Sequence, residues 1–480
     1  MSHKKELNQL LKYSSISLDL SKTPFTLLFV YPGIGVGKVF EELAGCTKQL
    51  CLLATTQKRA QTLGIQIAAL SSIDEMTESL DSVYFPVGTI SPDLIPEDLL
   101  VTKGEQHFFT RTAYLVHPDG QVERWIDPDG ALMVDDGFKK VEQSYLHFVH
   151  TVTQDSMDAQ NLNQCNVVAL PTGADSLSVL SFDMANNYIL KRMSAVGTDI
   201  ETDYMFQSIE NNNSIFPVMY AQRVFGSERW IVMEKLSELP KRNAGELIER
   251  LASFYQANRT DTNIELDYHL HHRFFQILNS EGFANTLKSL SISEGHVLEK
   301  TVLVSNRKTL TIENMLNVLS DALPTFQSPI VSRIHGDVHW PNVLCNKEGE
   351  IKLIDPRLNW DGCFTIDGYF DPTYDLATLL HSSVLEKLHH TEISKNIDGT
   401  LVASTYLVDI IEELESDLLN STSILLPTLI DDLTFVQKLR VFCANATFGW
   451  LKYNQVVSSH EKWSFYFGLT LYWLDRAFKK

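Results

Sequence analysis

The stretches RIHGDVHWPNVL (333–344) and IKLIDPR (351–357) decide the fold of the larger part of this chain. Asn342 follows Asp337 by five positions, and Asp355 ends the apolar run of the second stretch. The intervening NKEGE (346–350) predicts a tight hairpin turn, because glycine and asparagine favour turns. We expect this hairpin to bring two carboxylates and one amide together at one end.

Such a trio of oxygen-bearing side chains fits phosphoryl transfer. One carboxylate orients the attacking hydroxyl and accepts its proton, while the amide and the other carboxylate hold Mg²⁺ against nucleotide phosphates. The catalytic loop of protein kinases has the same Asp-to-Asn spacing, with a metal-binding Asp downstream. Each motif alone is weak, because Asp and Gly also mark turns and strand ends, so the ordered set carries the prediction.

Together with FDPTYDLATLLHS (370–382), these stretches resemble the aminoglycoside phosphotransferase and choline kinase group of kinase-like small-molecule phosphotransferases. The resemblance covers about residues 165–480. It implies an α+β bilobal kinase-like domain, with a small β-rich lobe over 165–238 and a large, mostly helical lobe over 239–480. The sequence departs from the family pattern at Phe370-Asp371, where Gly-Asp often stands.

Carried over residue by residue, the resemblance implies that Asp337 is the catalytic base and that Asn342 and Asp355 are Mg²⁺ ligands. It also implies that His335 holds the loop and that Asp375 supports it from the start of a helix. On its own, Asp375 reads as an ordinary helix cap.

The segment 165–238 reads as five short strands with one helix, ETDYMFQSIE (201–210). Lys191 lies in the strand candidate NYILKRM (187–193), and an ion pair with Glu201 would hold it against nucleotide phosphates. Strand alternation favours Lys191 over Arg192 for this role.

Two more segments complete the predicted nucleotide site. VMEKL (232–236) resembles the hinge whose backbone meets adenine, with Met233, Glu234 and Leu236 as the expected contacts. LPTGADSLSV (170–179) should be the hairpin over the phosphates, through Gly173 and Ser176. Its single glycine makes it thinner than the Gly-rich loop of protein kinases.

Residues 1–155 read as an α/β domain of unknown role. Expected strands are 25–31, 49–56, 65–71 and 82–88, expected helices are 38–45 and 57–64, and 107–128 should form a hairpin turning at His117-Pro118-Asp119-Gly120. A polar stretch near 150–165 is the expected boundary.

The loop VYPGIGVGKVF (30–40) raises a separate question, because glycine-rich loops can cradle phosphate. A Walker A reading fails, since Pro32 stands at its first glycine and Val39 follows Lys38. The glycines at 33, 35 and 37 resemble the first motif of methyltransferases, but no acidic residue ends the expected second strand. An anion site on a helix N-terminus and a plain strand-to-helix turn both stay open.

Composition limits the function classes. The formal charge of −20, from 40 basic and 60 acidic residues, disfavours nucleic acid as a partner. The six cysteines are scattered without a CxxC pair, which favours reduced thiols in a cytosol over zinc or a disulfide framework. We expect a cytoplasmic protein with no membrane span.

The leading hypothesis is therefore an Mg²⁺-dependent kinase that uses ATP or GTP to phosphorylate a hydroxyl of a small molecule. Sugars, amino alcohols and aminoglycoside-like cations stay open as substrates. The front domain (residues 1–155) would add a second activity in a bifunctional enzyme. The alternative is a catalytically silent nucleotide-binding module. A protein kinase is disfavoured, because no APE-like activation segment follows Asp375. The sequence does not set the oligomeric state.

Overall fold

The computed structural model describes residues 2–72, 83–172, 176–196, 198–209, 215–293, 302–303, 311–360, 363–364, 367–395 and 400–479. The chain forms two compact units. The first comprises residues 1–199 and 218–235, and the second comprises residues 200–217 and 236–480. The first unit holds the predicted α/β domain together with most of the predicted β-rich lobe, and the second holds the helical part.

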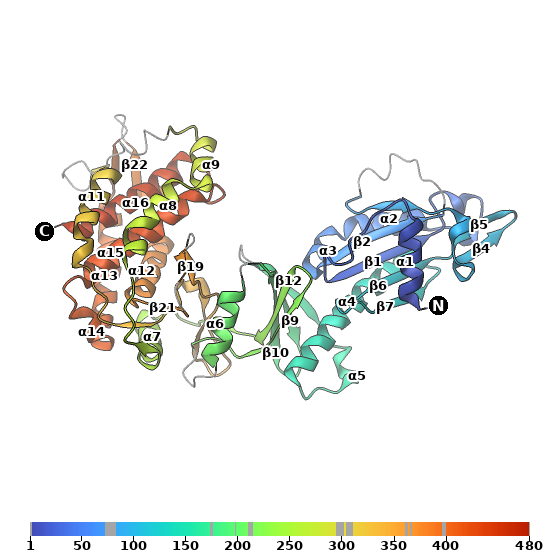
Figure 1. Cartoon of the computed structure of the whole chain (residues 1–480), viewed down its shortest axis with the longest axis horizontal. Coiled ribbons are helices and arrows are strands. Elements are labelled where there is room, and N and C mark those ends of the chain that lie inside the picture. The colour runs from blue at the N-terminus through green and yellow to red at the C-terminus, as the bar shows by residue number, and fades with distance from the viewer. Residues whose placement is uncertain are drawn as a thin grey trace. The chain divides into compact units, whose positions relative to one another are not determined.

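The front of the first unit is a five-stranded sheet (Figure 1). Its order is β3 (Val87–Thr89), β2 (Ile65–Ser71), β1 (Phe25–Tyr31), β6 (Thr112–Val116) and β7 (Val122–Ile126). Strands β3, β2 and β1 pair in parallel, whereas β6 pairs antiparallel with both of its neighbours, β1 and β7. The predicted hairpin turn is confirmed, since His117 N donates to Gln121 O at 2.9 Å.

The two faces of this sheet are covered by different helices. Leu27 and Phe29 of β1 join the core shared with α2 (Cys46–Thr55), α3 (Gln57–Leu63) and α4 (Gly130–Thr153). Leu28 and Val30 join a second core with α1 (His3–Tyr13). The alternation follows from the period of two in a strand.

Three elements of this region differ from the prediction. Of the described residues 83–88 in the expected strand 82–88, only Val87 and Gly88 lie in a strand, β3. The expected strand 49–56 is part of helix α2, because Leu50 and Leu53 are buried at helical spacing while Cys51 is exposed. The expected helix 38–45 is instead two short 3₁₀ turns, Val36–Lys38 and Glu41–Leu43. Short apolar runs fit either period, which explains the error at 49–56.

The second sheet of the first unit is antiparallel throughout. Its order is β11 (Met219–Phe225), β12 (Glu228–Glu234), β10 (Asn187–Ser194), β9 (Ser176–Asp183) and β8 (Val167–Leu170), matching the five predicted strands. The β-rich part of the predicted kinase-like fold is therefore present.

One continuous core joins the two sheets of the first unit. Trp230 of β12 packs among aromatic rings of the front domain, including Tyr145 at a centroid distance of 4.7 Å and Phe25 at 6.1 Å. Arg192 of β10 is only 1% exposed and donates to Thr62 O at 2.6 Å, while its Nε donates to Glu228 at 2.8 Å. The front domain thus forms the packing partner of one face of the second sheet.

The second unit is mostly helical, as predicted (Figure 1). Its long helices are α6 (Asp199–Ile209), α7 (Ala244–Ala257), α11 (Ile312–Ala322), α12 (Thr373–Lys387), α13 (Thr405–Leu425), α15 (Phe435–Gly449) and α16 (His460–Phe478), with the shorter α8 (Arg273–Leu278) and α9 (Glu281–Ser289). Helix α15 packs against both α12 and α16.

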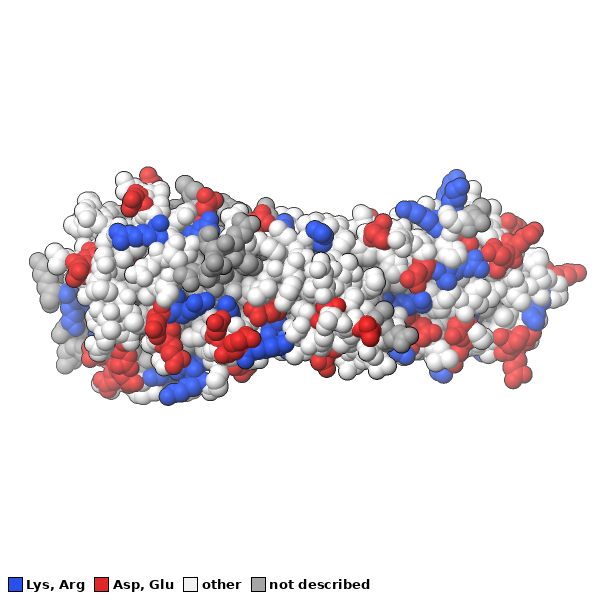
Figure 2. Space-filling view, turned by 90° about the horizontal axis from the view of Figure 1, so that it is seen from below, with Lys and Arg blue, Asp and Glu red and all other residues white. Residues whose placement is uncertain are grey.

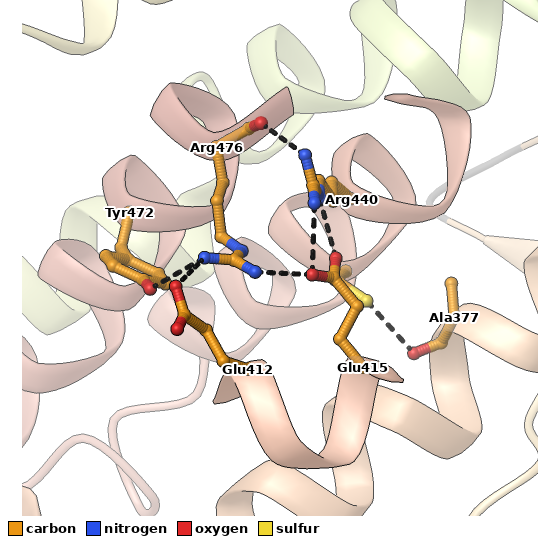
Figure 3. Close-up of polar contacts among 7 residues, drawn as sticks. Ala377, Glu412, Glu415, Arg440, Tyr472 and Arg476 are labelled. Carbon is orange, nitrogen blue, oxygen red and sulfur yellow. Dashed lines mark hydrogen bonds and ion pairs between the residues drawn. The ribbon is translucent and has the colours of Figure 1, made fainter. Parts of the chain in front are cut away.

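A buried ion cluster links three of these helices. Glu415 of α13 lies between Arg440 of α15 and Arg476 of α16, which it contacts at 2.6 Å each (Figure 3). Burial alone would raise the pKa of Glu415, but the hydrogen bonds from the two arginines lower it below its usual value. The charged carboxylate therefore braces the helices against one another.

On the face shown in Figure 2, acidic side chains are interspersed with basic ones rather than separated into one field. Among the described residues, no helix has both the length and the apolar character needed to cross a bilayer.

Candidate functional site

A small hairpin in the second unit carries the predicted metal ligands. Strands β17 (Val343–Cys345) and β18 (Ile351–Leu353) pair antiparallel, with Val343 opposite Leu353. One further bond, from Ile354 N to Asn342 O at 3.0 Å, extends the pairing by a residue. Asn342 and Asp355 therefore sit at the same end of the hairpin, as the spacing predicted.

Asp337 is tied to this end through its main chain. The side-chain nitrogen of Asn342 donates to Asp337 O at 3.1 Å. This bond fixes the amide, and among the described residues no hydrogen bond uses its Oδ1. The carboxylate of Asp337 is partly exposed and lies 3.7 Å from His339 Nε2 and 4.0 Å from Arg357 Nε.

His335 connects the Asp337 loop to the Asp355 segment. It is fully buried, and its Nε2 donates to Ile354 O at 2.9 Å while Asp337 N donates to its Nδ1 at 3.3 Å. Burial lowers the pKa of His335 to about 4, so the ring is neutral with the proton on Nε2. Arg357 N also donates to His335 O at 2.9 Å. His335 therefore clamps the segments that carry both carboxylates.

Asp375, near the start of α12, is buried and contacts the backbone of the loop that leads to Asp337. Its carboxylate accepts from His335 N at 2.8 Å, Gly336 N at 2.6 Å and the Tyr255 hydroxyl at 2.9 Å. Burial raises the pKa of Asp375 to about 6, against the lowering effect of these hydrogen bonds. The residue caps no helix end here; it fixes the backbone that precedes Asp337.

Asp355 adopts an unusual backbone conformation, with φ at 57°. The left-handed region disfavours most side chains but is tolerated by Asp. Such conformations are concentrated at functional sites, where the surrounding structure enforces them. Here the clamp by His335 on Ile354 provides that enforcement.

Lys191 and Arg192 lie on opposite faces of β10, because side chains alternate along a strand. Arg192 faces the front domain, where it donates to Thr62 O, and it also pairs with Glu228 of the neighbouring strand β12. Lys191 is therefore on the face turned away from the front domain. Glu201 lies in α6, which belongs to the second unit from Ile200 onward, so its pairing with Lys191 stays a prediction.

The other predicted nucleotide contacts are placed as follows. Met233 and Glu234 end β12, and Glu234 N donates to Val218 O at 2.9 Å. The first unit ends at Lys235 and the second resumes at Leu236, so the predicted hinge coincides with a crossing between the units. Ser176 opens β9, and Gly173 lies outside the described residues.

Three residues that support the site were missed by sequence reasoning. Tyr255 of α7 binds Asp375, Thr378 Oγ1 accepts from Val338 N at 3.1 Å, and the Phe216 ring stacks on His335 with centroids 5.9 Å apart. Tyr255 and Phe216 are distant in sequence from the motif, and no local pattern signals them. Thr378 follows Asp375 by three residues on one helix, a spacing that puts both on one face.

The glycine-rich loop at 33–37 does not lead into an α-helix. Short 3₁₀ turns follow it, and α2 begins only at Cys46. The loop is therefore not a tight turn into an α-helix, and no α-helix N-terminus directly follows it, whereas anion binding by the amides of the loop itself stays a prediction. The segment 49–56, taken as the second strand of a methyltransferase-like unit, is helical.

The residues at the hairpin end fit Mg²⁺ in chemical type. Asn342 and Asp355 present oxygen donors, which this hard cation prefers. The amide nitrogen of Asn342 is already used by Asp337 O, which leaves its oxygen as the donor atom toward a cation.

No protein-family model matches the sequence, and no curated protein matches it. Among solved structures, a thermostable mutant of an aminoglycoside phosphotransferase is 12% identical, with 66% of this chain and 96% of that chain covered and a TM-score of 0.38. Ethanolamine kinase of Plasmodium vivax is 12% identical, with 70% and 88% covered and a TM-score of 0.38. Peroxiredoxin Q of Xanthomonas campestris is 17% identical, with 26% and 83% covered and a TM-score of 0.22.

The first two of these solved structures belong to the group that the sequence motifs resemble. TM-scores this low do not transfer a residue's role from one protein to another. The roles proposed below therefore rest on the side chains of this chain.

Proposed function

We propose that this chain is a Mg²⁺-dependent phosphotransferase that moves the γ-phosphoryl group of ATP or GTP to a hydroxyl of a small molecule. The observation that carries the proposal is the clamp at the hairpin end. His335, fully buried and neutral, ties the segment of Asp355 to the loop of Asp337, and Asn342 binds the main chain of Asp337.

On this proposal Asp337 orients the substrate hydroxyl and accepts its proton as the oxygen attacks the γ-phosphorus. Its carboxylate is partly exposed, as that of a residue that must reach substrate has to be. Asn342 and Asp355 would hold Mg²⁺, which when bound neutralises charge on the phosphates. Asp375 acts indirectly, by holding the backbone of the loop.

The residues predicted to contact the nucleotide keep their roles in this proposal. Lys191 would pair with phosphate oxygens and Glu201 would orient Lys191. The backbone at Met233, Glu234 and Leu236 would meet the base, and the hairpin with Gly173 and Ser176 would cover the phosphates. Catalysis would then come mainly from positioning and from neutralising charge.

The test is phosphate transfer by the purified full chain. It would be incubated with γ-labelled ATP or GTP, with and without Mg²⁺, and with a panel of sugars, amino alcohols and aminoglycosides. We expect Asp337→Asn to lower the transfer rate by about 10²–10⁴-fold, the usual contribution of a general base. Asp409→Asn, at an exposed position on α13, is the matched control and should keep the wild-type rate.

Two outcomes would count against the proposal. Full activity in Asp337→Asn would remove the assigned base. Nucleotide-induced thermal stabilisation without transfer to any acceptor would instead favour the silent nucleotide-binding module.

A further inference from the structure

A second cluster of reactive side chains lies in the first unit. Cys46 is the first residue of α2 and is 4% exposed. Nη2 of Arg111 lies 3.4 Å from its sulfur. Arg111 immediately precedes β6, so the fold brings together two residues that are 65 positions apart in the sequence.

The guanidinium of Arg111 is a buried positive charge, with the residue 5% exposed. It donates to neutral carbonyls, those of Pro128 and Leu43 at 2.8 Å each and that of Ala44. Its Nε has no hydrogen-bond partner, and none of the described carboxylates forms an ion pair with it. A buried charge without an opposite charge is costly.

The only described group in contact with Arg111 that can become an anion is the sulfur of Cys46. The carboxylate of Asp129 forms no ion pair with Arg111; it caps α4 by accepting from Ala131 N at 2.8 Å, and it interacts with the charge of Arg111 only through space. Negative charge that develops on or next to the Cys46 sulfur would therefore give the Arg111 guanidinium an opposite charge within contact distance.

The start of α2 adds to this effect. The residue before Cys46 is Gly45, with φ at 105°, and no side chain caps the helix there. The first backbone N–H groups of a helix carry partial positive charge, which stabilises negative charge that develops next to them during a reaction. The φ of Gly45, not lack of space, favours glycine here, because a Cβ at this position would lie 3.5 Å from Nη2, an ordinary contact distance.

A second thiol stands on the same helix. Cys51 is exposed and follows Cys46 by five residues. In an intact helix this spacing separates the Cα atoms by about 7.5 Å along the axis, beyond the reach of a disulfide. Bonding between the two sulfurs therefore requires the first turn of α2 to unwind.

We propose that Cys46 is a peroxide-reducing thiol, with Arg111 stabilising the reacting charge and Cys51 supplying the second thiol. The thiolate of Cys46 attacks one oxygen of a small hydroperoxide, and the O–O bond breaks. Sulfur is oxidised to sulfenic acid, while the other oxygen leaves as an alkoxide or hydroxide and takes up a proton. Nη2 of Arg111, 3.4 Å from the sulfur, lies next to this developing negative charge. Because Cys46 is only 4% exposed, its sulfur can be reached by small oxidants but not by bulky ones.

The second step consumes the sulfenic acid. The thiol of Cys51 attacks the Cys46 sulfur, water leaves, and a Cys46–Cys51 disulfide forms as the first turn of α2 opens. An external dithiol then reduces the disulfide to two thiols and is itself oxidised to a disulfide. This inference concerns the first unit and does not depend on the phosphotransferase proposal.

The experiment compares cysteines within the reduced full chain. One equivalent of hydrogen peroxide is added, the reaction is stopped at set times, and each cysteine is followed by peptide mass spectrometry. Cys165 is the internal reference: it is partly exposed, and burial together with Asp183 and Asp155 raises its pKa. We expect Cys46 to be oxidised about a hundredfold faster than Cys165, comparable to the effect of one oxyanion donor.

Variants separate the roles. Cys51→Ser should stop at a Cys46 sulfenic acid that dimedone traps, whereas the wild-type chain should give the Cys46–Cys51 disulfide. Arg111→Gln should slow oxidation of Cys46 on the order of a hundredfold, and Cys165→Ser should leave it unchanged.

Equal oxidation rates at Cys46 and Cys165 in the wild-type chain would overturn the proposal, even if Arg111→Gln failed to fold. A folded Arg111→Gln variant with the wild-type rate would remove the role of Arg111. Absence of the disulfide in the wild-type chain, with sulfenic acid accumulating instead, would remove the role of Cys51.

Discussion

Replacing Asp375 with Asn should loosen the loop that precedes Asp337, while the free energy of unfolding of the chain changes little near pH 8. Its carboxylate accepts one hydrogen bond at Oδ1, from Gly336 N, and two at Oδ2, from His335 N and the Tyr255 hydroxyl. An Asn side chain has a single acceptor oxygen, so at least one backbone N–H of the loop must face the amide NH₂ group. A buried donor left without a partner costs about 1–3 kcal/mol.

An opposing effect arises from the charge of Asp375. Burial raises its pKa from 3.8 to about 6, and each unit corresponds to about 1.4 kcal/mol. Above pH 6 the folded chain therefore bears a cost of roughly 3 kcal/mol for the buried carboxylate, which Asn removes. We expect a small net change in the free energy of unfolding near pH 8. Near pH 5 the folded carboxyl is largely protonated, and Asn should be clearly destabilising.

The sign follows from proton uptake. Between pH 3.8 and about 6 the folded state holds the Asp375 proton more tightly than the unfolded state does, so this group's contribution to stability is lost as the pH rises. Asn does not titrate. The stability difference, wild type minus variant, should therefore shrink from pH 5 to pH 8.

Hydrogen exchange gives the local measurement. Peptides covering residues 333–338 should exchange about ten- to a hundredfold faster in Asp375→Asn at both pH values, because a lost bond of 1–3 kcal/mol no longer protects the loop. Asp409→Asn should leave these peptides unchanged. If Asp375→Asn also leaves them unchanged, the three hydrogen bonds do not hold the loop and the reasoning fails.

Three further predictions follow from other residues. Glu415→Gln should destabilise the helical unit by about 1–3 kcal/mol, measured by denaturant unfolding, because the hydrogen bonds from two arginines lose their charged acceptor; an unchanged midpoint would mean that the cluster adds nothing. In the Asp375→Asn chain, which lacks the opposing titration of Asp375, the helical unit should lose stability on acidification from pH 6.5 to about 4, since burial lowers the pKa of His335 to about 4 and of His381 to about 3, and only the unfolded chain takes up these protons; pH-dependent melting of this variant checks the prediction, with a flat profile contradicting it. Lys191→Met should weaken ATP binding ten- to a hundredfold in a titration, as expected for a lost charge-assisted contact; unchanged affinity would place the phosphates elsewhere.

The hairpin site could be predicted because its parts are close in sequence. Asp337, Asn342 and Asp355 lie within one loop and one hairpin, so spacing and turn residues were enough to bring them together. The supporting residues Tyr255 and Phe216 could not be predicted, because they reach the site from distant helices and segments through packing alone.

The front domain was harder to predict. Its hairpin at 117–120 has a strong turn signal, but the run 49–56 is equally apolar as a strand and as a buried helix face. That error hid the start of α2. Cys46 meets Arg111 only once the sheet has formed, and neither residue stands out by local pattern.

The shared core around Trp230 and Arg192 limits how this chain can be divided. A fragment that begins after residue 165 would keep all five strands of the second sheet but would strip one of its faces of Phe25, Tyr145 and the carbonyl of Thr62. The aromatic side chains on that face of the second sheet would then form an exposed hydrophobic surface prone to aggregation. The second sheet therefore cannot be separated from the front domain without exposing part of its core. Strand β10, which carries Lys191, depends on the front domain for the packing of its other face.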